Sequence, residues 1–145
     1  MGDISKDINT SFENAKVKAF LNIIYTANWI QSQQVTFFKP YGISPQQYNI
    51  LRILRGAGKA IAVQTIKDRM LERAPNATRL MDKLCSKELI TRVPCPGDRR
   101  VVHIEIRKPG LELLELIDKH IKRDPLHNLT RKEANVLSDL LDKIR

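Results

Sequence analysis

Residues 71–110 constrain the fold most, because they join an amphipathic helix to a short hairpin with a basic tip. Over 74–87, apolar residues recur at intervals of three and four, and the opposite side is polar. Two strands are predicted over 90–95 and 101–106, joined by a turn at 96–100, since apolar and polar residues alternate in the second strand. A helix that can enter one groove of DNA, followed by a basic hairpin that can reach the neighbouring groove, predicts DNA binding.

Composition limits the classes of function. The chain has 145 residues, the size of one domain, and 42% hydrophobic residues, enough for a modest core. Lysine and arginine outnumber aspartate and glutamate by 25 to 16, so the formal net charge of +9 favours a polyanionic partner. No apolar run approaches the roughly 20 residues that span a bilayer, and the N-terminus lacks a signal-peptide pattern. We expect a cytoplasmic protein with no membrane partner.

Long helical patterns flank the central segment on both sides. Thr10 and Glu13 predict a capping box for a helix that reaches residue 38, after a loose lead-in over residues 1–9. Its apolar side is broader than a surface helix needs, which favours packing against a second subunit. Further helices are predicted within 109–145, the last of them opened by a second capping box at Thr130.

Three short helices are predicted between the first long helix and the hairpin. Ser44 and Gln47 predict a capping box at the start of the first, and Gly58 marks its end. The second should cover 63–70, and the third is the amphipathic helix described above.

Three short helices followed by a two-stranded hairpin form a winged helix-turn-helix. We therefore predict one domain over 1–145, mainly α with a small β-hairpin wing. Residues 44–107 should bind DNA, and the long helices over 10–38 and 109–145 should form a dimer interface.

The predicted recognition helix and wing resemble those of a known family. Asn76–Leu84 is similar to the recognition helix of the MarR family of bacterial transcription regulators, and Asp98–Arg100 with Lys108–Gly110 is similar to its wing and exit. The match covers most of the chain. The resemblance implies an obligate homodimer, a pseudo-palindromic operator and an effector that changes the distance between recognition helices. The chain departs from the family at Leu71 and Glu88, where the family has glycine.

Candidate DNA contacts follow from groove geometry. Arg79, on the polar side of the helix, can pair with guanine O6 and N7 in the major groove; its alternative is a solvated arginine paired with Asp82. Asn76 and Thr78, in the first turn, can reach base edges or phosphates, or can bond free backbone N–H groups. Lys83 is expected at a phosphate.

The hairpin tip and the preceding helix supply further candidates. The resemblance implies that Asp98 and Arg100 form an internal pair that fixes the wing, with an arginine in the minor groove; Arg99 and Arg100 are both candidates for that role. Gln64 and Thr65 lie near a helix N-terminus, which attracts phosphate. An ordinary charged turn is the alternative for the hairpin tip.

Aromatic residues gather at the junction of the first two helices, where such regulators bind aromatic effectors; core packing explains them equally well. The candidates for an effector pocket are Tyr25, Trp29, Phe37 and Tyr48, with Phe38 and Tyr41 nearby.

We expect both cysteines to be reduced thiols. Cys85 lies on the apolar side of the recognition helix, so we interpret it as structural, with a redox switch as the alternative. Cys95 should be more exposed.

No metal site, cofactor or enzymatic activity is predicted. His120, Asp124 and His127 are the only suggestive grouping, and Pro125 disrupts their helical spacing. A Gly-rich phosphate loop and a nucleophile with a placed base are both absent from the sequence. The hypothesis is a sequence-specific transcriptional regulator, a repressor released by a small molecule. The alternative is an architectural or RNA-binding protein that uses the same basic surface.

Overall fold

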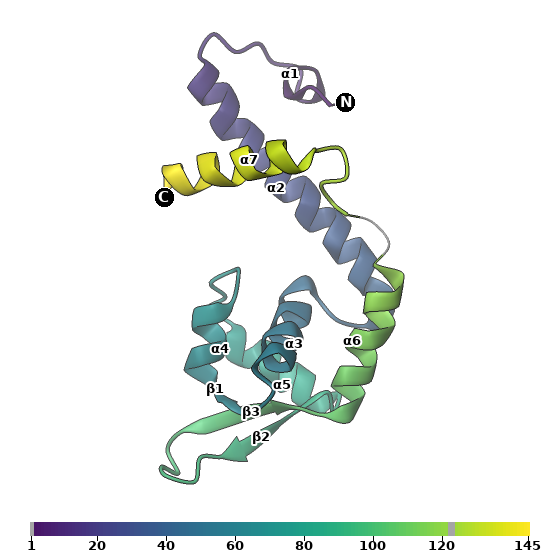
Figure 1. Ribbon diagram of the computed structural model, residues 1–145, viewed down its shortest axis with the longest axis vertical. Coiled ribbons are helices and arrows are strands. Elements are labelled where there is room, and N and C mark those ends of the chain that lie inside the picture. Colours follow the sequence, from purple (N-terminus) through teal and green to yellow (C-terminus); the bar gives the residue numbers. More distant parts are fainter. Residues whose placement is uncertain (1, 122–123) are drawn as a thin grey trace. The chain divides into compact units, whose positions relative to one another are not determined.

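The computed structural model describes residues 2–121 and 124–145 and divides the chain into two compact units, Met1–Leu114 and Glu115–Arg145 (Figure 1). The fold is mainly helical with a small sheet, as predicted. The first unit holds the helices α1 (Ile4–Asp7), α2 (Ala15–Phe38), α3 (Pro45–Ala57), α4 (Val63–Arg69) and α5 (Ala77–Ser86), the 3₁₀ turn η1 (Lys39–Tyr41) and the strands β1 (Ile61–Ala62), β2 (Ile90–Pro94) and β3 (Val102–Ile106). Helix α6 (Lys108–His120) runs across the boundary, and α7 (Arg131–Ile144) lies in the second unit.

The sheet is antiparallel, with strand order β1-β3-β2. Strands β2 and β3 form the predicted hairpin, in which Ile90 pairs with Ile106. The expectation of two strands was wrong in one respect, because β1 pairs with the other edge of β3 through Ile61 and Ile104. β3 is therefore the central strand of the sheet, and its Ile104 is fully buried.

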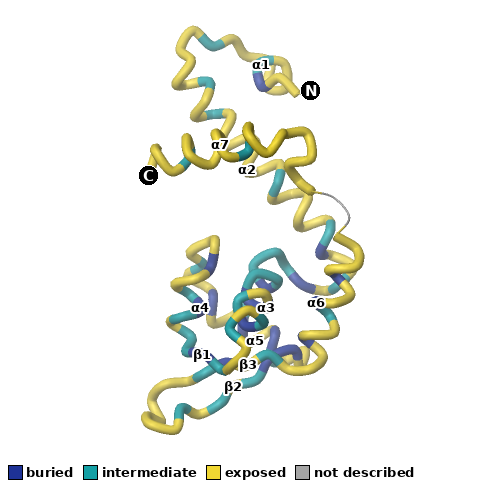
Figure 2. The backbone as a smooth tube through the Cα atoms, viewed as in Figure 1, coloured by how far each residue is buried: buried dark blue, intermediate teal, exposed yellow. Residues whose placement is uncertain are grey.

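The core of the first unit lies between α3, α4, α5 and the sheet (Figure 2). Each apolar side chain removed from water there contributes about 1.5–3 kcal/mol, which fixes α5 to the rest of the unit. The largest fully buried side chains of these elements are Ile50, Leu51, Leu54, Ile66, Met81, Leu84, Ile90 and Ile104.

Local capping signals were mostly read correctly. The capping boxes at Ser44 and Thr130 are both present, and Gly58 ends α3 with a left-handed φ of 63°. The predicted cap of the first long helix was wrong. Asn14 caps α2, since its Oδ1 accepts from the backbone N–H groups of Lys16 and Val17 at 2.8 and 3.4 Å. The lead-in over residues 1–9 also contains the short helix α1.

Leu71 and Glu88, which stand where the family has glycine, differ in backbone conformation. Glu88 follows α5 with φ +60°, the left-handed region in which a side chain is strained. Leu71 does not have a positive φ, and Met70, the residue that caps α4 before it, is in extended backbone with φ −66° and ψ 136°. The N–H of Leu71 donates to the Asn49 side chain at 3.0 Å. Only the turn at Glu88 therefore calls for glycine.

Two helices carry exposed apolar side chains in numbers that a lone chain rarely leaves in water. Phe38 is the one buried residue of α2, and α7 buries none. Among the described residues, no helix is long and apolar enough to cross a membrane. The large exposed apolar side chains of α2 are Val17, Phe20, Ile23, Ile24, Tyr25, Trp29 and Val35, and those of α7 are Val136, Leu137, Leu140 and Ile144.

Candidate nucleic-acid interface

The side chains that α5 buries in the core determine which of its side chains face outward. Ala77, Met81 and Leu84, at spacings of four and three, are almost completely buried. The opposite side of the helix is exposed and polar. It presents Thr78, Arg79, Asp82, Lys83 and Ser86 to the surroundings.

The start of α5 differs from the expectation in its boundary. The helix begins at Ala77, three residues later than about Ala74, because the N–H of Ala77 closes a turn onto the carbonyl of Ala74 at 3.1 Å. Asn76 is the N-cap residue, but its side chain makes no capping hydrogen bond. The capping alternative for Asn76 is therefore not realised, and its exposed amide is available to another partner.

Arg79 is exposed and does not pair with Asp82. Asp82 instead pairs with Arg92 of β2. Within the described part of the chain, the guanidinium of Arg79 contacts no acidic side chain, so it is available to an acceptor outside the chain.

The wing tip is an exposed turn between β2 and β3, and Figure 1 shows its loop reaching beyond the helices of the first unit. The Asp98 carboxylate accepts the backbone N–H of Arg100 at 2.9 Å, and the Asp98 carbonyl accepts the N–H of Val101 at 3.1 Å. Asp98 thus fixes the turn through backbone N–H groups. Among the described residues no ion pair joins it to the Arg100 side chain, so both Arg99 and Arg100 present free guanidinium groups.

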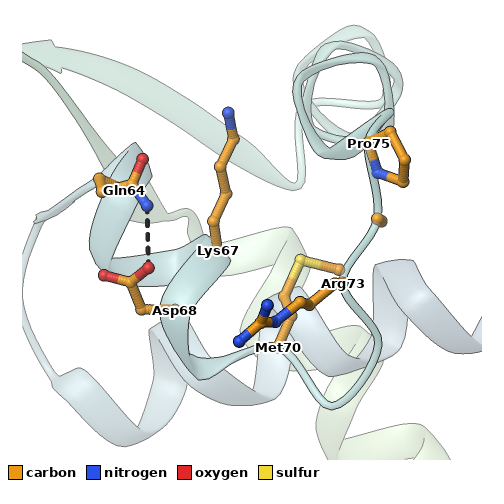
Figure 3. Close-up of a pocket in the computed structure, with 7 residues that line it drawn as sticks. Gln64, Lys67, Asp68, Met70, Arg73 and Pro75 are labelled. Carbon is orange, nitrogen blue, oxygen red and sulfur yellow. Dashed lines mark hydrogen bonds between the residues drawn. The ribbon is translucent and has the colours of Figure 1, made fainter.

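A hollow of about 670 Å³ lies between α4 and the segment that leads to α5 (Figure 3). Gln64 lines it, but the amide of Gln64 donates to Asp68 at 2.8 Å, and Thr65 is half-buried. Lys67 and Arg73 also line it and point in different directions. These two cations were not predicted, and they do not converge on one anion.

Comparison with known proteins identifies the family. The MarR family model matches residues 43–102. The regulator PecS of Dickeya dadantii is 30% identical over 112 residues, which are 74% of this chain and 68% of that protein. The multiple antibiotic resistance protein MarR of Salmonella typhimurium is 30% identical over 128 residues, 84% of this chain and 88% of that protein. The chain belongs to the MarR family.

Solved structures agree with this assignment. A mutant MarR from E. coli complexed with operator DNA has a TM-score of 0.76 and 26% identity, covering 92% of this chain and 99% of that chain. A MarR transcription factor from Planctomyces limnophilus has a TM-score of 0.68 and 30% identity, covering 92% and 95%. The chain is therefore a DNA-binding transcription regulator with a winged helix-turn-helix fold, and not an enzyme.

The aromatic residues expected at an effector site of this MarR-family protein fall into two groups. Phe37 and Tyr48 pack around Phe38, with ring centroids 5.0 and 4.4 Å from it. Tyr25 and Trp29 are exposed on α2. A hollow of about 400 Å³ lies nearby, but none of these four lines it. Its lining comprises Val35, Lys39, Gly42, Ile43, Ser44, Pro45, Gln46, Gln47, Lys83 and Lys87.

Three cations meet at that second hollow. Lys83 comes from the outward side of α5, Lys87 follows the helix, and Lys39 begins η1. The Lys87 ammonium donates to the carbonyl of Gly42, which ties the end of α5 to the turn before α3. Lys83 thus lies where the recognition helix meets the start of α3, a placement that the sequence pattern did not reveal.

The two cysteines are both half-buried. Burial raises the pKa of the Cys85 thiol, with the negative charge of Asp82 acting in the same direction and Arg92 opposing it. A raised pKa leaves less of the nucleophilic thiolate at neutral pH. Cys85 thus has the environment of a structural cysteine. In the described part of the chain, no three His, Cys, Asp or Glu side chains are grouped as metal ligands.

Proposed function

We propose that this regulator is a repressor that binds a pseudo-palindromic operator as a homodimer and releases it when a small aromatic molecule binds. The observation that carries the proposal is the polar outward side of α5 in the same compact unit as a basic wing tip. A major groove about 12 Å wide admits one helix, and only there do base edges distinguish all four base pairs.

The proposed DNA contacts divide between the two elements. Arg79 reads a guanine, a contact worth about 1–3 kcal/mol of discrimination, and Asn76 and Thr78 reach bases or phosphates beside it. Arg99 or Arg100 enters the minor groove, where the negative potential attracts guanidinium groups. Phosphate contacts are assigned to Lys83, Gln64 and Thr65, with Asp98 holding the wing turn.

A homodimer is favoured by the exposed apolar side chains of α2 and α7. Burying them against a second copy would remove this surface from water, and two-fold symmetry matches a palindromic site. In this proposal, the segments 10–38 and 109–145 form the dimer, and 44–107 binds one half-site. Removal of residues 126–145 is expected to give an unstable chain that loses DNA binding. A well-folded monomer with intact affinity would refute this arrangement.

The effector part of the proposal is supported by the exposure of two aromatic side chains on a helix assigned to the dimer. Tyr25 and Trp29 remain exposed, while Phe37 and Tyr48 pack around Phe38. We propose that a small aromatic molecule binds beside these four side chains. Operator affinity measured in the presence of a panel of phenols and aromatic acids tests this. If none of these compounds changed the operator affinity, the effector part of the proposal would be refuted.

Competition binding tests the DNA-reading role. Affinity for DNA upstream of the chain's own gene and for a scrambled duplex should be compared at matched salt, because phosphate contacts alone are salt-dependent and sequence-blind. Arg79→Ala should lower the preference for the operator by roughly tenfold or more. Lys6→Ala, at an exposed position of α1 outside the segments assigned to DNA and to the dimer, also removes one positive charge and should leave the preference unchanged. Equal affinity for both duplexes would favour the architectural or RNA-binding alternative.

A further inference from the structure

Asp82 is a negative charge on the side of α5 that faces outward. It lies between Arg79 and Lys83, on a surface assigned to a polyanion. Its carboxylate pairs with the guanidinium of Arg92, which projects from β2 ten positions further along the chain. The side chains of Asp82 and Arg92 are 52% and 50% exposed, so the pair lies at the surface rather than in the core.

An unpaired carboxylate at this position would have two consequences. It could accept a hydrogen bond from the N4 amino group of cytosine and so read a base, or it could repel nearby phosphates and weaken binding to every sequence. Pairing with Arg92 engages Oδ1 of the carboxylate and compensates its charge. The carboxylate is therefore engaged within the protein before DNA arrives.

The pair also joins the two elements that contact DNA. The buried side chains Ala77, Met81 and Leu84 determine which side of α5 faces the core, and the Asp82–Arg92 pair adds a contact on the exposed side. A carboxylate–guanidinium pair is directional and charge-assisted. It restrains rotation of α5 about its own axis relative to β2, the first strand of the wing hairpin.

We propose that Asp82 and Arg92 are positioning residues that hold the recognition helix in a fixed orientation to the wing and shield the Asp82 charge from phosphates. This inference rests on the proposed function, because it concerns how sharply the same surface discriminates between sequences. The pair acts through Arg79 and the wing arginines, which contact DNA themselves.

A stability role alone makes a different prediction. Ion pairs this exposed add little to folding stability, so Asp82→Asn and Arg92→Gln should leave the melting temperature within about 2 °C of the unchanged chain. Their effects should appear in the affinity ratio between operator and scrambled duplex. That ratio is expected to fall about three- to tenfold in each variant.

The two variants should differ in their affinity for scrambled DNA. Arg92→Gln leaves the Asp82 charge uncompensated and should weaken that affinity. Asp82→Asn frees Arg92 and should strengthen it. The double variant should return affinity for scrambled DNA close to its original value, but it should not restore the ratio, because the directional contact is absent.

Lys108→Gln is the matched control. It removes one positive charge from another surface ion pair, in which Lys108 lies 3.8 Å from Glu112 on α6. Its affinity ratio should remain within about twofold of the unchanged chain. A ratio unchanged in both Asp82→Asn and Arg92→Gln would overturn the proposal. A loss confined to one operator cytosine in Asp82→Asn, with Arg92→Gln silent, would show instead that Asp82 reads a base.

Residual dipolar couplings of the α5 amides in the DNA-free protein separate this inference from the proposed function. Loss of the pair should change the orientation of α5 relative to β2, and the Lys108→Gln control should not. Equal affinity of the unchanged chain for both duplexes would count against the proposed function, and the couplings would still decide whether the pair orients α5. Unchanged couplings would overturn the inference even if the operator is recognised.

Discussion

Gly110 offers the sharpest test of how the wing is joined to α6. It is buried near the start of the helix, and a Cβ added there would lie 2.4 Å from the carbonyl oxygen of Leu89 and 2.8 Å from Cγ1 of Ile106. The Leu89 carbonyl is backbone and already accepts the N–H of Arg107 at 2.9 Å, so it cannot move without losing that bond. Gly110→Ala must therefore displace the helix or the hairpin.

The expected cost can be worked from two opposing effects. Overpacking of this kind costs about 1–3 kcal/mol, while alanine gains up to about 1 kcal/mol over glycine inside a helix. We expect a net loss of about 1–2 kcal/mol in the free energy of unfolding. That loss corresponds to a melting temperature several degrees lower, at about 2–8 °C per kcal/mol.

Gly56→Ala is the matched control, since a Cβ on Gly56 of α3 would meet nothing within 4 Å. The same chemical change should there raise stability by up to about 1 kcal/mol. Urea and thermal unfolding followed by circular dichroism would measure both. If Gly110→Ala proved as stable as Gly56→Ala, the argument from the Leu89 carbonyl would be refuted.

Three further predictions follow from single residues. Glu88→Gly should raise the free energy of unfolding by about 1 kcal/mol, because it relieves a left-handed backbone and loses only the exposed pair with Arg107; a lower urea midpoint would contradict this. Hydrogen bonds from the Thr130 backbone N–H and hydroxyl lower the pKa of Glu133, so the stabilisation of α7 by this cap is complete above the ordinary glutamate pKa of about 4.3 and is lost as pH falls through the lowered value. Amide exchange in the first turn of α7 should therefore quicken in acid, and a Glu133→Gln variant that shows the same acid response would exclude this cause. Burial raises the pKa of Cys85, so a disulfide reagent should label it slowly at neutral pH and faster after unfolding, whereas rapid labelling of the folded chain would argue for a reactive thiol.

The features predicted correctly share one property: their signals are local in sequence. Ser44 and Gln47 are three residues apart, and their capping box needs no information from the rest of the chain. The periodicity of α5 likewise placed Met81 and Leu84 in the core, because one helix has only one side to bury. Local signals also compete: Thr10 and Glu13 predict a capping box, whereas Asn14, four residues after Thr10, bonds the first free N–H groups of α2.

The features that were missed depend on contacts between elements. The strand β1 has two residues, too few for a period, and it exists because Ile61 pairs with Ile104. The sequence offers a pair between Arg79 and Asp82 as the alternative to a DNA contact of Arg79, and the partner of Asp82 is instead Arg92 on β2. The turn through Glu88 reverses the chain and so determines which residues of α5 and β2 face each other. The spacing of these residues in the sequence does not predict that geometry.

Affinity and specificity should therefore respond to different substitutions in this chain. The net charge of +9 supplies attraction to any duplex, and removing single lysines should lower affinity for all sequences and reduce its dependence on salt. Specificity depends on the orientation of α5, since a base contact is directional and a small rotation of the helix moves Arg79 away from a base edge. Substitutions at the buried side of α5, and the double substitution of Asp82 and Arg92 that leaves the net charge unchanged, should consequently change the ratio between operator and scrambled DNA with little change in the salt dependence. Measuring the affinity ratio and the salt dependence for each variant separates residues that attract DNA by charge from residues that orient α5.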